Sequence, residues 1–203
     1  MVFDFDGTIA DSLAAVTKIG NRLAPEFGLA PIKDNEVEKL RGKSSREIFK
    51  TLNISIYKVP FILKKVRKEF SGEIENLKPI DGISKALFAL KKRGVVLAIL
   101  TSNSQENVQK FLKKNKLAIF DFIYSGSSIF GKDKVIKKMI LEKQLDLTRT
   151  IYIGDETRDI EACKKCHLRI AAVSWGINNY KILESHKPDW LIDHPSQLLD
   201  IIF

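Results

Sequence analysis

The sequence lacks any long uninterrupted apolar run, and none approaches the roughly 20 residues that a membrane-spanning helix needs. No charged-then-apolar leader ending in small residues opens the chain, so the cytoplasm is the expected location and no membrane partner is expected. Low-complexity tracts and internal repeats are also missing. The 203 residues, of which 44% are hydrophobic and 29% charged, are typical of a soluble globular protein with one sizeable core and room for an inserted domain.

Cysteine is scarce, and the only two cysteines, Cys163 and Cys166, form a C-x-x-C pair. Such a pair can carry redox chemistry or bind a metal. No second pair of ligands accompanies it, and none of the three histidines stands at a zinc spacing. The segment DIEACKKC is typical of a helix with Ile160 and Cys163 one turn apart, which favours two small buried hydrophobic side chains.

The net charge of +9, from 34 basic and 25 acidic residues, raises the question of nucleic-acid binding. Most of the basic residues are lysines, whereas bidentate recognition of phosphates and bases favours arginine. Clusters such as ALKKRG and FLKKNK fall where helices are expected to end, and cations there complement the helix dipole. We therefore interpret them as solvated surface and do not expect a nucleic-acid partner. The positive field could still attract small anionic substrates.

Strand-like and helix-like segments alternate over most of the chain. The expected strands are residues 2–5, 95–100, 122–124, 151–153, 170–174 and, more weakly, 190–192. The segments VVLAIL and IYIG are continuously apolar, as in strands covered on both faces. The expected helices are residues 83–93, 105–115, 133–144, 158–167 and 196–202. This alternation predicts an α/β fold with a Rossmann-like, mostly parallel sheet and helices on both faces.

Residues 13–78 break the alternation, because helical patterns occur there and no strand as apolar as VVLAIL. Asp34 and either Ser44 or Ser45 are expected to be N-caps of helices in this stretch. The pattern predicts an all-helical insertion. The expected domains are an α/β catalytic core at 1–12 and 79–203 and a helical cap at 13–78.

Polar residues follow the expected strands, at the edge where open parallel sheets bind ligands. They are Asp4 and Asp6 after the first strand, Thr101, Ser102 and Asn103 after the second, Lys132 and Lys134 after the third, and Asp155 and Asp159 after the fourth. Asp4 and Asp6 stand two apart, so they should share one face of the chain. Because an unpaired buried carboxylate is costly, this pair indicates a cation, an acid/base pair, or both.

Four segments in this order, DFDGT, TSN, GKDKVIKKMI and GDETRDIEA, resemble the motifs of the haloacid dehalogenase superfamily in its phosphatase branch. The resemblance covers nearly the whole chain, and the insertion is similar to the helical cap of phosphoglycolate phosphatases and β-phosphoglucomutases. It implies a Mg²⁺-dependent phosphoric monoester hydrolase that acts on a small phosphorylated metabolite, phosphoglycolate-like or a sugar phosphate. The K-P-x-P form common among phosphoglycolate phosphatases is missing, so the substrate stays open.

The resemblance assigns Asp4 as the nucleophile that forms an aspartyl-phosphate. It assigns Asp6 as the acid that protonates the leaving group and then activates water, which requires a raised pKa. The Asp4 carboxylate, the Asp6 main-chain carbonyl and the Asp155 carboxylate would hold Mg²⁺, and Asp159 would support the ion. Because dehalogenases of this family generally lack the second aspartate, Asp6 argues against hydrolytic dehalogenation.

The remaining roles concern the phosphoryl group and the rest of the substrate. Thr101, through its hydroxyl, and Ser102, through its N–H, would bind phosphoryl oxygens. Lys132 would supply positive charge, with Lys134 as the alternative. In the cap, Lys43 and Arg46 could contact a second anionic group, although residues at a helix start are more often solvated.

Two other functions stay open. A β-phosphoglucomutase-like phosphomutase would carry the same motifs, and a non-catalytic anion- or nucleic-acid-binding protein could keep the same fold. We expect Glu156 and Arg158 to form a salt bridge or an exposed face. The sequence is compatible with both a monomer and a homodimer.

Overall fold

A computed structural model describes residues 1–126 and 131–201. Its single sheet has six strands in the order β3-β2-β1-β4-β5-β6, and every neighbouring pair is parallel. The strands are β1 Val2–Phe3, β2 Ala98–Thr101, β3 Phe122–Ser125, β4 Ile151–Gly154, β5 Arg169–Val173 and β6 Trp190–Ile192. The expected α/β class and parallel sheet are confirmed.

Strand β1 lies at the centre of the sheet and sets the position of the polar residues. Phe3 is in register with Ile99 of β2 and with Ile153 of β4. Asp4 comes directly after β1, Thr101 ends β2 and Asp155 follows β4. Because the strands are parallel, these three segments end at one edge of the sheet.

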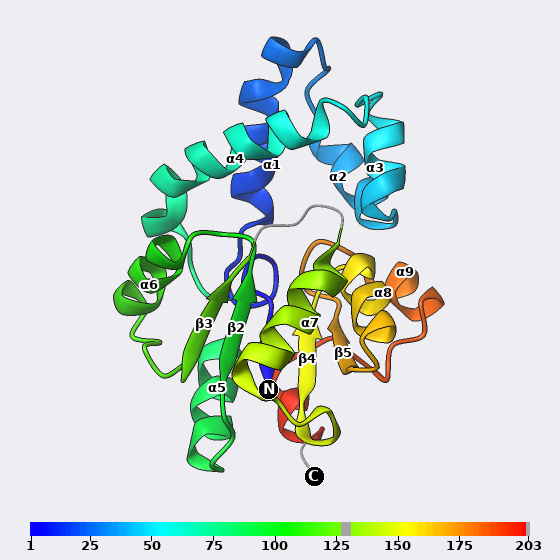
Figure 1. The fold of residues 1–203 in the computed structure, drawn as a ribbon. Coiled ribbons are helices and arrows are strands. Elements are labelled where there is room, and N and C mark those ends of the chain that lie inside the picture. The colour runs from blue at the N-terminus through cyan, green and yellow to red at the C-terminus, as the bar shows by residue number, and fades with distance from the viewer. Residues whose placement is uncertain (127–130, 202–203) are drawn as a thin grey trace.

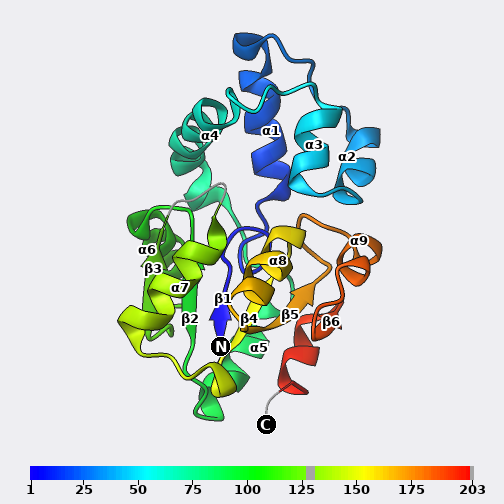
Figure 2. The same ribbon diagram turned by 45° about the vertical axis from the view of Figure 1, so that its right-hand side comes forward.

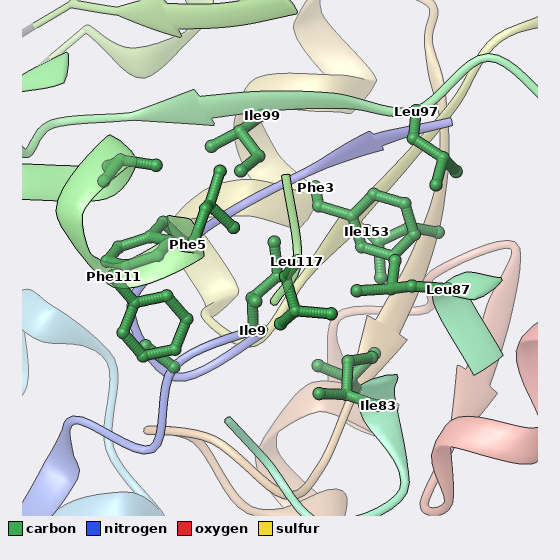
Figure 3. Packing of buried hydrophobic residues seen from close by; sticks show 14 of the residues in the cluster. Phe3, Phe5, Ile9, Ile83, Leu87, Leu97, Ile99, Phe111, Leu117 and Ile153 are labelled. Carbon is green, nitrogen blue, oxygen red and sulfur yellow. The ribbon is translucent and has the colours of Figure 1, made fainter. Parts of the chain in front are cut away.

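Helices cover both faces of the sheet (Figures 1 and 2). One buried cluster joins Phe3 and Ile99 to side chains of α5 (Ile83–Lys92) and α6 (Gln105–Lys114). Figure 3 shows this cluster. The rings of Phe5 and Phe111 pack edge to face, with their centroids 5.0 Å apart. A second cluster, on the opposite face, joins Val2 and Tyr152 to α7 (Lys132–Lys143) and α8 (Thr157–Lys165). The central strand β1 is therefore buried on both sides.

The structure corrects three expectations about individual elements: the length of the first strand, the last helix and one N-cap. Strand β1 stops at Phe3, because the Phe5 carbonyl turns away to accept hydrogen bonds from residues 9 and 10. The expected helix at 196–202 is a short 3₁₀ helix, Pro195–Leu199, and residue 202 lies outside the described residues. Asp34 is the first residue of α2 (Asp34–Arg41) and not its N-cap.

Residues 13–78, which the sequence predicts to form a cap, contain helices as their only regular elements, and this segment is called the cap below. It contains α1 Leu13–Leu23, α2, α3 Ser45–Thr51 and α4 Val59–Glu73, with 3₁₀ helices at Ala24–Phe27 and Ile74–Asn76. Ser44 is the N-cap of α3 and accepts a hydrogen bond from Glu47 N, as expected for one of the two serines. These helices lie beyond the edge of the sheet where the polar residues gather (Figures 1 and 2).

The chain crosses between the sheet and the cap twice, and the two crossings lie side by side. Asp11 N donates to Lys78 O at 2.9 Å, and Ile80 N donates to Ile9 O at 2.9 Å.

The last α-helix, α9 Tyr180–Ser185, lies near β6. No helix in the described ranges has both the length and the apolar character to cross a membrane. Cys163 and Cys166 are free and buried, in agreement with their interpretation as small hydrophobic side chains.

Candidate active site

Lys132 and Asp4 form the centre of the site. The lysine is the first residue of α7, and its Nζ lies 2.5 Å from Oδ2 of Asp4. It also pairs with Asp159 and lies over the Tyr152 ring, 5.3 Å from the centroid. Lys134, two residues further on, is exposed. Of the two candidate lysines, the fold therefore brings Lys132 to the aspartates.

Three buried carboxylates form the cluster best suited to a cation. Ligand atoms of Asp4, Asp155 and Asp159 all lie within 4.8 Å of one another. Burial raises the pKa of Asp155 well above its usual range, and the carboxylates of Glu156, Asp4 and Asp159 raise it further. Burial also raises the pKa of Asp4, although the Lys132 ammonium opposes that change. Carboxylate oxygens crowded in this way fit Mg²⁺, whose charge would relieve their repulsion.

The Asp155 carboxylate is held on both of its oxygens. Thr8 Oγ1 donates to Oδ1 at 2.9 Å, and Ile177 N donates to Oδ2 at 2.7 Å. A Cβ atom at Gly7 would lie 2.1 Å from Oδ2, and one at Gly176 would lie 2.3 Å from it. Both positions therefore require glycine so that the backbone can approach the carboxylate.

Asp6 has a raised pKa. Burial, followed by the charge of Asp4, raises its pKa to about 7, although a hydrogen bond from Asn103 opposes the rise. Its Oδ1 is buried and has no hydrogen-bond partner within the described residues. The expectation of a raised pKa is confirmed. Asn103 is a functional candidate to which sequence reasoning assigned no catalytic or binding role, although its place in the segment TSN pointed to it.

The segment after β2 supplies hydrogen-bond donors. Thr101 is buried, and its Oγ1 accepts a hydrogen bond from Asn103 N at 2.9 Å, which leaves the hydroxyl hydrogen free to point elsewhere. Ser102 and Asn103 line a cavity between the sheet edge and the cap, whereas Thr101 is not among the described residues that line it. Ser104 is the N-cap of α6.

A cavity of about 550 Å³ lies between the sheet edge and the cap. Its core side includes Asp4, Asp6, Ser102, Lys132 and Arg158, and its cap side includes Ser44, Ser45, Arg46, Ile48, Phe49, Leu63, Val66, Arg67 and Phe70. The cap side thus combines apolar walls with two arginines. Of the two expected cap residues, Arg46 lines this cavity, whereas Lys43 is not among its described lining residues.

Arg67 is a candidate that sequence reasoning missed. It is half-buried in α4, and within the described ranges its guanidinium forms no ion pair with a carboxylate. Burial and the nearby charge of Arg158 lower its pKa, and Asp6 opposes that change. The local sequence, FILKKVRKEF, offers no sign of this, because Arg67 is one of several basic residues on the helix.

Glu156 and Arg158 form the expected ion pair. Arg158 Nε donates to Glu156 Oε1 at 2.8 Å, and Glu156 is buried. Burial alone would lower the pKa of Arg158, but Glu156, Asp159 and Asp4 raise it above its usual range. The Arg158 side chain is 34% exposed and faces the cavity. Across the cavity, Ser45 Oγ of the cap donates to Glu156 Oε2 at 3.1 Å.

Comparison with known proteins identifies the family. The model of the haloacid dehalogenase-like hydrolases matches residues 1–173. The chain belongs to this family. A phosphoglycolate phosphatase from Synechococcus elongatus is 34% identical over the whole of this chain and 96% of its own length. A second phosphoglycolate phosphatase, from Aquifex aeolicus, is 27% identical over the whole chain and 95% of its own length.

Solved structures show the same fold. The crystal structure of a predicted phosphatase from Clostridium acetobutylicum superposes with a TM-score of 0.82, covering 98% of this chain and 97% of that one at 23% identity. The family resemblance carried by the four motifs is confirmed, as is the expectation of a hydrolase in the phosphatase branch of this family.

Proposed function

We propose that the protein is a Mg²⁺-dependent phosphatase that hydrolyses a small phosphorylated metabolite, phosphoglycolate-like or a sugar phosphate. The observation that carries the proposal is the contact of Lys132 with Asp4, beside three clustered carboxylates and an Asp6 whose pKa is near 7. The relative from Synechococcus elongatus is a phosphoglycolate phosphatase, which supports the same reaction class.

Asp4 is the proposed nucleophile. Its Oδ1 accepts a hydrogen bond from Phe5 N at 2.8 Å and its Oδ2 faces Lys132, so the carboxylate is fixed before substrate arrives. It attacks phosphorus as the bond to the leaving oxygen breaks, and an aspartyl-phosphate forms. When bound, Mg²⁺ would be held by Asp4, the Asp6 carbonyl, Asp155 and Asp159 and would offset the repulsion between the phosphoryl dianion and the carboxylate.

Asp6 moves the protons in both half-reactions. In its neutral form it donates a proton to the leaving alkoxide, which departs as an alcohol. The resulting carboxylate then accepts a proton from the water that attacks the aspartyl-phosphate, which releases phosphate and restores both aspartates. A pKa near neutrality suits a group that must act as acid and then as base.

The phosphoryl group would be bound by Thr101, Ser102 and Lys132. The Lys132 ammonium supplies charge to the phosphoryl oxygens, and the hydroxyl of Thr101 with the N–H of Ser102 supplies neutral donors. Burial would lower the pKa of Lys132, but Asp159 and Asp4 raise it well above its usual range. The two carboxylates therefore favour the charged form of the lysine.

The cap would determine which leaving groups the enzyme accepts. Because the cavity lies between the sheet edge and the cap, it favours a small phosphate ester over a phosphorylated protein as substrate. Closure of the cap would exclude water from it. We propose that Arg67 and Arg46 contact an anionic or polar group of the substrate, with Phe49 and Leu63 packing against its carbon atoms. The proposed location stays the cytoplasm, where the two free cysteines would remain reduced, and both monomer and homodimer stay open.

Phosphate release from a panel of esters tests the proposal. The panel contains phosphoglycolate, sugar phosphates, nucleotides and an aryl phosphate, each with Mg²⁺ and with chelator. Asp4→Asn and Asp6→Asn should abolish Mg²⁺-dependent release, whereas Asp11→Asn, at an exposed aspartate after the same turn, should retain it. Folded protein that releases no phosphate from any ester would contradict the proposal. Isomerisation of β-glucose phosphates would then indicate a mutase, and its absence a binding protein.

A further inference from the structure

The cap and the core meet at a second place, away from the two chain crossings. Arg41, the last residue of α2, donates through Nη2 to the carbonyls of Ser174 and Gly176, each at 3.1 Å. In return, Asn178 of the core donates through Nδ2 to the carbonyls of Arg41 and Lys43, at 3.0 and 2.8 Å. Each side chain thus binds main-chain oxygens of the other part.

Residues 174–178 form the core side of this contact. They also hydrogen-bond to the acidic loop, residues 155–156, which joins β4 to α8. Ile177 N donates to the Asp155 carboxylate at 2.7 Å, and Asn178 N donates to the Asp155 carbonyl at 3.1 Å. The side-chain Oδ1 of Asn178 accepts from Thr157 N, the first residue of α8, at 2.9 Å. One segment of five residues therefore contacts the cap on one side and the best candidate cation ligand on the other.

Asn178 is the residue that joins the two sides. It is 1% exposed, and its amide oxygen and amide nitrogen are used in opposite directions, toward the acidic loop and toward the cap. A buried amide that loses its partners on one side carries unsatisfied polar atoms, so it must move or admit water. Release of the cap would therefore disturb the position of Thr157 and, through residues 177 and 178, that of Asp155.

We propose that Asn178 is a positioning residue that couples docking of the cap to cation binding at Asp155. The inference rests on the proposed Mg²⁺ site. Because coupling between two equilibria is reciprocal, a bound cation favours the docked cap, and a docked cap raises the affinity for the cation. Whenever the cation is bound, the cap would therefore already be docked over the cavity when the reaction begins.

The test uses Arg41, which lies in the cap, binds two core carbonyls through Nη2 and pairs through Nη1 with Glu38 of its own helix. Arg41→Ala should raise the dissociation constant for Mg²⁺ about fivefold or more, as measured by calorimetric titration without substrate. Asn178→Ala should raise it at least as much, and Arg41→Lys, which keeps the charge but lacks the fork geometry, should resemble Arg41→Ala. Arg22→Ala removes a cap ion pair with Glu69, which has no core partner among the described residues, so the affinity of this variant for Mg²⁺ should equal that of wild type.

Trp175 provides a second measurement within the same segment. It is one of only two tryptophans, and its Nε1 donates to Thr8 O at 3.2 Å, next to the two carbonyls that Arg41 binds. In a Trp190→Phe background, Mg²⁺ should change the emission of Trp175, and adding Arg41→Ala should shift the midpoint of that change to higher Mg²⁺.

The outcomes separate this inference from the proposed function. Equal Mg²⁺ dissociation constants for wild type and Arg41→Ala, both folded by circular dichroism, overturn the coupling and leave the proposed phosphatase standing. No binding of Mg²⁺ by the wild type overturns both. A purely structural role for the contact predicts lower melting temperatures with unchanged Mg²⁺ affinity, and this result also contradicts the coupling.

Discussion

The ammonium group of Lys132 lies 2.5 Å from Oδ2 of Asp4, although 128 residues separate the two in the chain. The contact forms because β1 ends at the centre of the sheet and α7 begins at the same edge. The lysine pairs with Asp159 as well as with Asp4, so one positive charge lies between two of the clustered carboxylates. The pair is the simplest structural reason to treat Asp4 as a nucleophile.

Lys132→Ala should lower kcat for phosphate release by about 10² to 10³, because a charge aimed at the phosphoryl group is lost. Lys134→Ala is the matched control, two residues further along the same helix and exposed, and should retain nearly wild-type kcat. Steady-state kinetics at saturating Mg²⁺ measure both. An equal loss in the two variants would contradict the assignment of Lys132.

Asp6→Asn should stabilise the metal-free protein at alkaline pH. The pKa of Asp6 rises from 3.8 to about 7 on folding, so this group favours folding fully below pH 4 and loses that contribution as pH rises through 7. Removing it should raise the free energy of unfolding at pH 8 by up to about 4 kcal/mol, with little change at pH 4. Urea unfolding in chelator at the two pH values measures the difference. A stabilisation that is equal at both values would show that Asp6 does not titrate in this way.

Gly7→Ala should destabilise the protein by about 2 kcal/mol or more, because the added Cβ meets the Asp155 carboxylate and the residue has a positive φ of 76°. Gly20→Ala, within α1 and with no atom near the added Cβ, should instead stabilise it by up to about 1 kcal/mol. Thermal unfolding of both variants gives the comparison. A Gly7→Ala protein with the wild-type melting temperature would mean that the acidic loop is held less tightly than described.

Arg67→Ala should raise KM for an anionic substrate about tenfold or more and change kcat less, because the arginine lies on the cap side of the cavity. Lys68→Ala is the control, since this neighbouring residue on α4 is exposed. The substrate is the best ester of the panel. Unchanged KM in Arg67→Ala would remove this residue from substrate binding and leave Arg46 as the cap candidate.

Much of the site could be predicted from the sequence because it depends on regular geometry. Parallel strands end at one edge, so residues that follow β1 and β4, such as Asp4 and Asp155, must meet there once the strands are recognised. The apolar runs identified those strands, and the four motifs identified the family. The choice of Lys132 over Lys134 came from the family resemblance of the segment GKDKVIKKMI.

The rest depends on how the cap packs against the core. Arg67 is one basic residue among several on α4, and only the docked cap brings it to the cavity. Asn178 lies in a loop after β5 whose hydrogen bonds reach both Thr157 and Arg41, and no local pattern predicts such contacts. The end of β1 at Phe3 is likewise set by the turn that follows and not by strand propensity.

Trapping of the phosphorylated enzyme tests the central claim most directly. The protein is mixed with Mg²⁺ and its best ester, quenched in acid within milliseconds to seconds, digested and examined by mass spectrometry. A phosphoryl group on Asp4 in the wild type, with none in Asp4→Asn, is the predicted result. Steady turnover with no phosphate on Asp4 at any quench time, or turnover by Asp4→Asn, would contradict the assignment of Asp4 as the nucleophile.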